Sequence, residues 1–180
     1  GIRKVGHAGT LDPLAQGILV VGVGRDATKK LHDIVKKEKE YIAKIKFGEE
    51  STTDDAQGEK TSFNIQKTPT DLEIRNIIKK FIGKIEQIPP QFSAIKIKGK
   101  KAYEMARKGK IFDLEPREVE IKNIEILNYQ FPYLTIKVTC GSGVYIRSLA
   151  RDLGRELNIG GYLVELERTR IGDFIREKAI

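Results

Sequence analysis

The stretch Tyr-Ile-Ala-Lys-Ile-Lys-Phe at residues 41–47 alternates apolar and polar side chains. Because successive side chains of a strand point to opposite faces, this pattern predicts a β-strand with one buried face, beginning at Tyr41. Residues 119–129 and 133–140 predict two more strands on either side of a Phe-Pro pair, and residues 162–167 predict a last strand. These four segments form the expected sheet.

Helical patterns separate these strands. Residues 26–35 and 144–157 have helical spacing, and Thr70-Asp71-Leu72-Glu73 is a capping-box sequence that opens a helix running to about Phe81. The apolar run at residues 18–23 predicts a short buried strand. The expected fold is therefore of the α/β (α+β) class, a mixed and largely antiparallel sheet with flanking helices, in a single domain over residues 1–180.

Composition narrows the classes of function. The chain has 180 residues, enough for one core, and 33 Lys and Arg against 25 Asp and Glu give a net charge of +8. This charge favours a polyanionic partner such as nucleic acid, although many basic proteins bind none. With no apolar run long enough to span a bilayer and no leader sequence, we expect a cytoplasmic protein without membrane contact. One cysteine and two distant histidines predict no disulfide and no metal site.

The sequence His-Ala-Gly-Thr-Leu-Asp-Pro-Leu-Ala-Gln-Gly at residues 7–17 places a single acid, Asp12, in a loop between small residues. Such an acid is often a turn former. The Gly-Ser-Gly at residues 141–143 lacks the Lys-Ser/Thr ending of a P-loop, and no Ser or Cys elbow accompanies a histidine. If the chain is an enzyme, the remaining candidate is Asp12, as a covalent nucleophile or an acid–base group.

Four segments, in this order, resemble the signature segments of TruB-type tRNA pseudouridine synthases. They are Val-Gly-His-Ala-Gly-Thr-Leu-Asp-Pro-Leu-Ala at 5–15, Lys-Glu-Tyr at 39–41, Pro-Pro-Gln-Phe-Ser-Ala-Ile-Lys at 89–96 and Cys-Gly-Ser-Gly-Val-Tyr-Ile-Arg-Ser-Leu at 140–149. Guide-dependent archaeal and eukaryotic relatives share the first segment, whereas residues 98–109 look more like the bacterial stand-alone branch.

The resemblance implies the pseudouridine synthase fold and isomerisation of uridine to pseudouridine in the T-loop of tRNA, without a cofactor. It implies tRNA, through its T stem-loop, as the partner of a monomer with no obligatory protein partner. The target base must first leave its stack, so the resemblance also implies base flipping.

The family pattern implies three catalytic residues. Asp12 matches the nucleophile, which attacks either the base or the ribose carbon. Tyr41 matches the tyrosine that stacks on the flipped base near the carbon that loses a proton; without the motif, it would be read as a core aromatic. Arg147 matches the arginine that pairs with the acid and stabilises its charged form.

Other residues are expected to contact the substrate. His7 matches a histidine that supports the RNA where the base has left, although a lone histidine is more often structural. Asp55 lies in a less specific family segment and would equally suit a loop turn. Tyr145 belongs to the fourth segment. The remaining candidates lie in a basic run at residues 96–110 that suits either RNA contact or a solvated face; they are Lys98, Lys100 and Lys101.

The chain departs from the family pattern at both ends. The family carries a Lys-Pro-x-Gly motif before the first segment, and a small RNA-binding domain near its carboxyl terminus. Neither has a counterpart here, so we expect the greater part of a catalytic domain. A guide-dependent synthase subunit and a non-catalytic RNA-binding module remain alternatives.

Overall fold

The computed structural model describes residues 4–93, 95–97, 99–106, 108–109 and 112–179. Its helices are α1 (Arg25–Lys36), α2 (Asp71–Lys80), α3 (Ala102–Ala106), α4 (Ile146–Glu156) and the 3₁₀ helix η1 (Arg176–Lys178). Its strands are β1 (Val5–His7), β2 (Ala15–Gly17), β3 (Val21–Val23), β4 (Lys39–Phe47), β5 (Glu49–Ser51), β6 (Lys60–Ser62), β7 (Gly83–Gln87), β8 (Lys96–Ile97), β9 (Lys100–Lys101), β10 (Arg117–Gln130), β11 (Tyr133–Cys140), β12 (Gly161–Ile171) and β13 (Phe174–Ile175).

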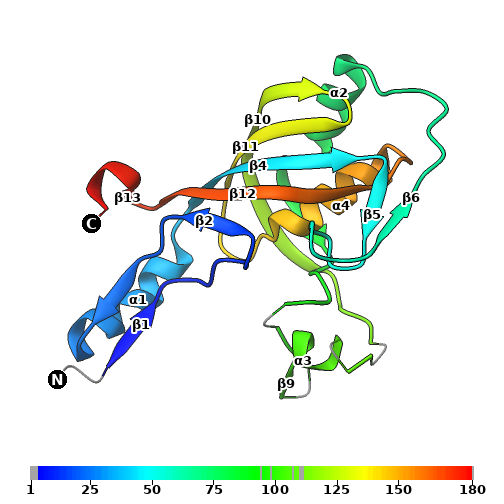
Figure 1. The fold of residues 1–180 in the computed structure, drawn as a ribbon. Helices are drawn as coiled ribbons and strands as arrows, with labels where there is room; N and C mark the ends of the chain where they lie inside the picture. The colour runs from blue at the N-terminus through cyan, green and yellow to red at the C-terminus, as the bar shows by residue number, and fades with distance from the viewer. Residues whose placement is uncertain (1–3, 94, 98, 107, 110–111, 180) are drawn as a thin grey trace.

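The main sheet has the strand order β13-β12-β4-β11-β10-β7, and each neighbouring pair is antiparallel. The short strand β2 adds to β12 in the parallel direction. This confirms the predicted mixed, largely antiparallel sheet. In β4 every second residue is buried, as the alternation at residues 41–47 predicts (Figure 1).

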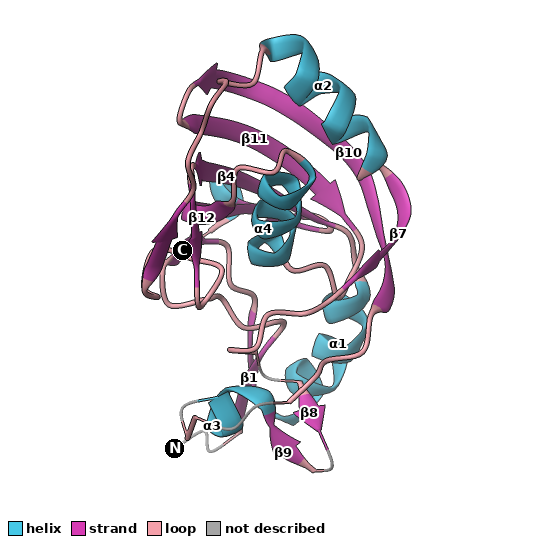
Figure 2. Cartoon of the chain, turned by 90° about the vertical axis from the view of Figure 1, so that its right-hand side faces the viewer, coloured by secondary structure: helices cyan, strands magenta, loops and turns pink. Residues whose placement is uncertain are grey.

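Helices α2 and α4 cover one face of the sheet (Figure 2). Their apolar side chains pack with those of β4, β10 and β11 in the core, among them Ile74, Leu149 and Ile136. The capping box is present as predicted, because the Thr70 hydroxyl accepts from the Glu73 N–H while the Glu73 carboxylate accepts from the Thr70 N–H. The predicted helix at residues 144–157 begins at Ile146, after a turn over residues 141–143.

The predicted buried strand at residues 18–23 is wrong in length and in burial. The strand is β3, residues Val21–Val23, and it pairs with β1 in a two-stranded ribbon apart from the main sheet. Helix α1 covers one face of this ribbon, where Leu31 packs against the backbone of Gly6 and Gly22. The side chains of Val21 and Val23 point the other way and are 51% and 52% exposed. The ribbon is covered on one face only, and the periodicity of the sequence does not show whether a second face is covered.

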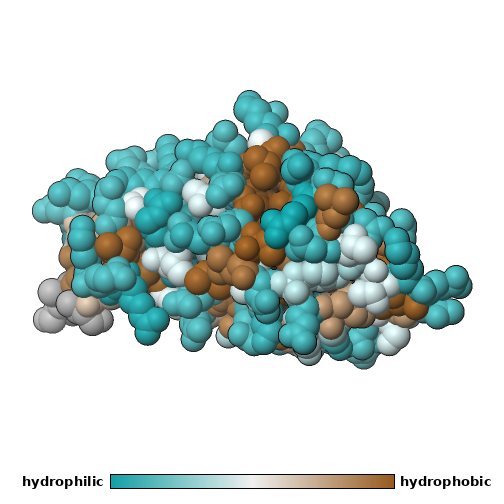
Figure 3. Space-filling model, turned by 90° about the horizontal axis from the view of Figure 1, so that it is seen from above, coloured by the Kyte–Doolittle hydropathy of each residue, from teal (hydrophilic) through white to brown (hydrophobic). Residues whose placement is uncertain are grey.

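The segment with β8, β9 and α3 projects from the main sheet at the end opposite α2 (Figures 1 and 2). Lys98 lies outside the described residues. Seen from above, the surface is mostly hydrophilic, with apolar side chains gathered in separate patches (Figure 3). Of the helices described, none combines the length and apolar character needed to cross a membrane.

Candidate active site

The Asp12 loop, residues 9–18, leaves the β1–β3 ribbon and returns to the main sheet through β2. A turn closes at its tip, where the Ala15 N–H donates to the Asp12 carbonyl at 2.8 Å. The Asp12 side chain is 29% exposed. The loop therefore presents one carboxylate that solvent and a ligand can both reach.

Arg147 holds this carboxylate with a two-toothed contact. Its Nε donates to Asp12 Oδ2 at 2.9 Å and its Nη2 donates to Asp12 Oδ1 at 2.8 Å. Arg147 lies in the first turn of α4, with a side chain that is only 5% exposed. Charge-assisted contacts of this parallel kind fix direction as well as distance.

The remaining Arg147 donors are bound to the surrounding loops. Nη1 donates to the Thr53 carbonyl at 3.3 Å, and Nη2 also donates to the Phe92 carbonyl at 3.1 Å. Asp55 Oδ2 lies 3.7 Å from Nη1. Two separate segments, residues 53–55 and the one that contains Phe92, thus hold the guanidinium in its orientation toward Asp12.

Asp55 forms a loop turn and also lies beside Arg147. Its Oδ1 accepts from the Thr53 hydroxyl at 2.5 Å and from the Gln57 N–H at 2.9 Å, which makes the turn. The residue is nevertheless buried, and its backbone bridges to Leu163 of β12. The Asp55 carboxylate is thus a second negative group beside the Arg147 guanidinium, in addition to Asp12.

Tyr41 occupies a buried position of β4, two residues after the strand begins at Lys39, and reaches the same cavity as Asp12. Burial raises the pKa of its hydroxyl to about 12, and the Cys140 and Asp12 charges act in the same direction. Arg168 opposes this rise through its charge and a hydrogen bond. The phenol is therefore neutral at physiological pH.

Tyr145 precedes α4 and is fastened by a buried glutamine. The Tyr145 N–H donates to Gln87 Oε1 at 2.8 Å, and Gln87 Nε2 donates to the Tyr145 carbonyl at 3.2 Å. Burial raises the pKa of the Tyr145 phenol, while the Arg117 and Arg147 charges oppose the rise. Gln87 thus ties the end of β7 to the start of the helix that carries Arg147.

These side chains surround a cavity of about 540 Å³. Its lining includes Asp12, Tyr41, Asp55, Tyr145, Arg147, Arg168, Lys39, Phe92, Ser93 and Tyr103. A smaller cavity of about 100 Å³ adjoins it, lined by Asp12, Tyr41, Tyr145, Arg168 and Leu166. Lys39 is buried at the edge, donates to the carbonyls of Val35 and Lys37, and has a pKa lowered by burial. The lining brings carboxylates, cations and aromatic rings around one space, which suits a small polar ligand.

Sequence reasoning missed Arg168 and Leu166. The predicted last strand stops at residue 167, whereas β12 continues to Ile171 and points Arg168 inward. Had the strand been predicted to extend beyond residue 167, its alternation would have placed Arg168 on the buried face. A charged residue at a buried position is a signal of a functional site.

Two kinds of predicted substrate residue, the histidine of β1 and the lysines of the basic run, remain apart from the cavity or undescribed. The described lining does not include His7, which pairs with Val21 in the ribbon. Lys100 and Lys101 form β9 in the projecting segment, and nothing of their side chains is described. Within the described part of the chain, no three His, Cys, Asp or Glu side chains gather as metal ligands would.

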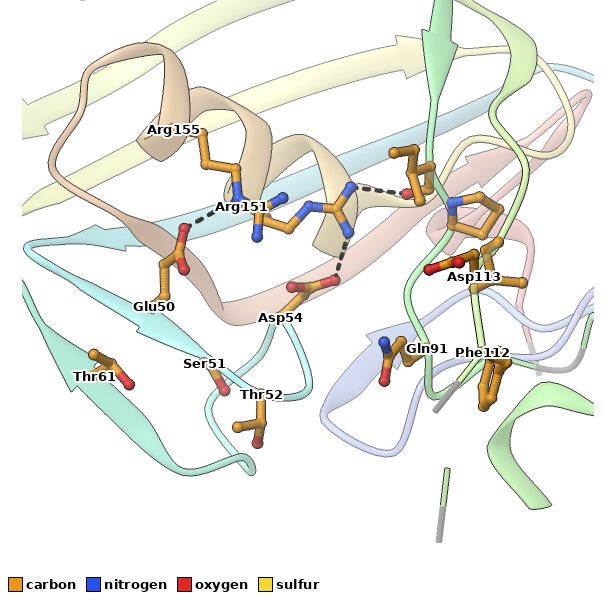
Figure 4. A pocket seen from close by; sticks show the side chains of 13 residues that line it. Glu50, Ser51, Thr52, Asp54, Thr61, Gln91, Phe112, Asp113, Arg151 and Arg155 are labelled. Atoms are coloured by element: carbon orange, nitrogen blue, oxygen red, sulfur yellow. Dashed lines mark hydrogen bonds and ion pairs between the residues drawn. The ribbon is translucent and has the colours of Figure 1, made fainter. Parts of the chain in front are cut away.

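A second cavity, of about 610 Å³, lies on the other side of the 52–58 loop (Figure 4). Arg151 and Arg155 of α4 reach into it, where they pair with Asp54 and Glu50 at 2.9 and 3.0 Å. Burial raises the pKa of Asp54, and the charges of nearby arginines oppose this rise. Its lining has these two arginines and three carboxylates, those of Glu50, Asp54 and Asp113, whereas the first cavity has three cations and two carboxylates. The second cavity therefore offers an anion less positive charge than the first.

Comparisons with known proteins find relatives that match along most of the chain. A model of the "TruB family pseudouridylate synthase (N terminal domain)" matches residues 1–146. The chain is 46% identical over 170 residues to tRNA pseudouridine synthase B of Parabacteroides distasonis, covering 94% of this chain and 72% of that protein. It is 44% identical to the enzyme of the same name from Bartonella quintana, covering 99% of this chain and 66% of that protein.

Solved structures of other proteins share the fold. A Cbf5-Nop10-Gar1 complex contains a chain that matches with a TM-score of 0.72 and 28% identity, over 97% of this chain and 42% of that chain. An H/ACA RNP bound to a substrate RNA containing 2′-deoxyuridine matches with a TM-score of 0.71 and 26% identity, over 99% and 42% of the two chains. The chain thus spans less than half of these larger proteins and about two thirds of the Bartonella relative.

Proposed function

Because the chain belongs to the TruB family of pseudouridylate synthases, we propose that it isomerises uridine to pseudouridine in tRNA. The observation that carries the proposal is the Asp12–Arg147 pair at the wall of a cavity that also holds Tyr41. Residues 1–180 supply the catalytic domain for this reaction.

The chemistry balances without any added reactant. The bond between ribose C1′ and uracil N1 breaks, a bond between C1′ and C5 forms, and the proton lost from C5 is replaced by one gained at N1. Since no atom or electron is gained or lost overall, the reaction requires no cofactor. What it requires is a nucleophile, a route for one proton, and a site that holds the detached base.

Asp12 is the nucleophile in this proposal. It attacks either the ribose C1′ or the uracil ring, and the glycosidic bond breaks with the carboxylate as the temporary covalent partner. Arg147 donates to both oxygens of the carboxylate, so the position of the Asp12 side chain at the cavity varies little. Asp55 positions Arg147 from below.

Tyr41 stacks on the extruded base and places its hydroxyl near C5. A base must leave its stack to reach a carboxylate inside a cavity, at a cost of a few kcal/mol, and stacking on an aromatic ring offsets part of it. The neutral phenol suits this contact because it retains a hydrogen to donate. Tyr145 bounds the same space.

The T-loop of tRNA is the proposed substrate region, with the projecting segment that holds β8, β9 and α3 as a contact for its phosphates. Lys98, Lys100 and Lys101 supply positive charge there, and the net charge of +8 favours association with RNA. His7 supports the RNA beside the vacated stack. We expect the protein to act as a cytoplasmic monomer.

A guide-dependent synthase subunit is the second candidate, favoured by the fold match to the Cbf5 complexes. The higher identity to proteins named tRNA pseudouridine synthase B favours the stand-alone reaction. A non-catalytic RNA-binding module fits less well, because a carboxylate at the RNA site repels phosphate and would serve no purpose without catalysis.

One assay tests all three. Unmodified tRNA labelled with tritium at uridine C5 is incubated with the purified protein alone, and tritium release is followed together with the pseudouridine content of the T-loop. Release at the T-loop supports the proposal. Release only after guide RNA and partner proteins are added supports the second candidate, and binding without release under both conditions leaves the non-catalytic module.

A further inference from the structure

Arg168 is a charged residue in the core that the reaction above does not use. It is 2% exposed and belongs to the largest fully buried side chains described. Its described hydrogen bonds go to oxygen atoms of neutral groups, not to a carboxylate. A buried guanidinium is costly unless its donors are met, so the identity of its partners indicates its task.

Its first task is to fasten both ends of the Asp12 loop. Nε donates to the Ile18 carbonyl at 2.7 Å and Nη2 donates to the Gly9 carbonyl at 3.1 Å. The Arg168 carbonyl also accepts from the Ile18 N–H at 2.8 Å. One residue of β12 therefore closes the loop that carries the carboxylate.

The loop backbone is shaped to allow this approach. Gly17 has a φ of +104°, and a Cβ added there would collide with the Arg168 backbone carbonyl. A side chain at Gly17 would be strained for both reasons. The close contact thus depends on the Arg168 side chain and also on the absence of a side chain at Gly17.

Its second task concerns Tyr41. Arg168 and Tyr41 are paired across β12 and β4, and both line the cavity that contains Asp12. A guanidinium has donors and no acceptor, so toward its cross-strand neighbour Arg168 the Tyr41 phenolic oxygen can act only as an acceptor. The hydroxyl proton of Tyr41 then points away from Arg168. If that proton leaves, the Arg168 guanidinium stabilises the negative charge on the phenolic oxygen.

We infer that Arg168 is a positioning residue, which fixes the Asp12 loop and the Tyr41 hydroxyl in position relative to each other. The inference rests on the proposed function. Arg147 binds the Asp12 carboxylate itself, whereas Arg168 acts on the loop backbone and on Tyr41. A residue with this role governs turnover and leaves RNA affinity unchanged.

The test measures tritium release from tRNA by the purified parent protein and by Arg168→Lys and Arg168→Gln. We expect kcat to fall by about a hundredfold in Arg168→Gln, with KM and tRNA affinity within about twofold of the parent. Arg168→Lys recovers little, because one ammonium cannot replace the two separate nitrogens that reach the Ile18 and Gly9 carbonyls. The matched control is Arg170→Gln, two residues along β12, where the arginine pairs with Glu38. A KM effect with unchanged kcat would overturn the inference.

A double-mutant cycle separates this role from a merely structural one. If Arg168 acts through the Tyr41 hydroxyl, Arg168→Gln costs at least about threefold less kcat in a Tyr41→Phe background than in the parent. Losses that simply multiply would overturn the inference. Thermal melting and tRNA binding establish that each variant is folded, and where Arg168→Gln is not, the cycle is run with Arg168→Lys. If the parent protein itself releases no tritium, the proposed function is refuted. This result differs from the failure of the inference, in which the parent is active and the Arg168 variants behave otherwise than expected.

Discussion

The Asp12 carboxylate and the Arg147 guanidinium meet through two hydrogen bonds, of 2.8 and 2.9 Å, although 135 positions separate them in the chain. The acid comes from a loop near the amino terminus, and the arginine comes from the first turn of α4. Their contact depends on how the strands that separate them in the sequence fold into one sheet. Each group can therefore be tested separately for its part in the proposed reaction.

Asp12→Asn should retain tRNA binding and lose pseudouridine formation on the order of 10⁴-fold or more, because an amide keeps the size but is no anionic nucleophile. Tritium release and filter binding measure the two properties. Asp33→Asn, on the exposed face of α1, is the control with the same chemical change. Turnover of Asp12→Asn near that of the parent would remove Asp12 as nucleophile.

Arg147→Lys should lower kcat by about ten- to a hundredfold, because an ammonium keeps the charge but cannot make the two-toothed contact or reach the Thr53 and Phe92 carbonyls. Arg155→Lys, farther along the same helix and 57% exposed, is the matched control. Single-turnover kinetics distinguish a slower chemical step from slower product release. Full activity of Arg147→Lys would show that charge alone suffices.

Tyr41→Phe should keep stacking and slow product formation, whereas Tyr41→Ala should lose both, with stacking worth roughly 1–3 kcal/mol per base. The comparison is made by kcat and by affinity for tRNA. Tyr133→Phe, on the exposed part of β11, removes a hydroxyl far from the cavity. A fully active Tyr41→Phe would leave the hydroxyl without a chemical role.

The raised pKa of Tyr41 predicts a pH effect on stability. The phenol ionises near pH 10 in the unfolded chain and at about 12 in the folded one. Below pH 10 both states hold the proton, and above it the unfolded state loses the proton first, so stability falls as pH rises from 10 toward 12. Urea unfolding at pH 9 to 11 should show a smaller fall in Tyr41→Phe than in the parent. An equal fall in both would place the titrating group elsewhere.

Gln87→Met should destabilise the fold by about 2–4 kcal/mol, because it removes the partners of the Tyr145 N–H and carbonyl and leaves both with unmet hydrogen bonds. Urea unfolding measures the change, and Gln66→Met, at an exposed position, is the control. Activity should fall as well, since Tyr145 precedes the turn that carries Arg147. A stability change no larger than that of Gln66→Met would contradict the role of Gln87.

Charge reversal of Lys98, Lys100 and Lys101 should weaken tRNA binding and reduce its salt dependence, because each phosphate contact contributes close to one unit of slope. Turnover on saturating tRNA should change little. The control applies the same charge change near α2, at the opposite end of the molecule, at Lys67, Lys79 and Lys84. An unchanged slope in the first variant would identify the basic run as a solvated face.

The amino-acid sequence by itself determined what depends on neighbouring residues. The alternation at residues 41–47 becomes the half-buried β4, and Thr70 with Glu73 becomes a capping box, because strand pleating and helix capping are local. The motif resemblance also predicted that Asp12, Tyr41 and Arg147 belong to one site, and the three residues do line one cavity.

Tertiary structure decided what depends on distant segments. The run at residues 18–23 looks like a core strand, yet its ribbon has a cover on one face alone, so Val21 and Val23 remain exposed. Arg168 looks like a charge after a strand, yet the pairing of β12 with β2 and β4 buries it beneath the Asp12 loop. Burial depends on which elements pack together, and local periodicity carries no information about that partner.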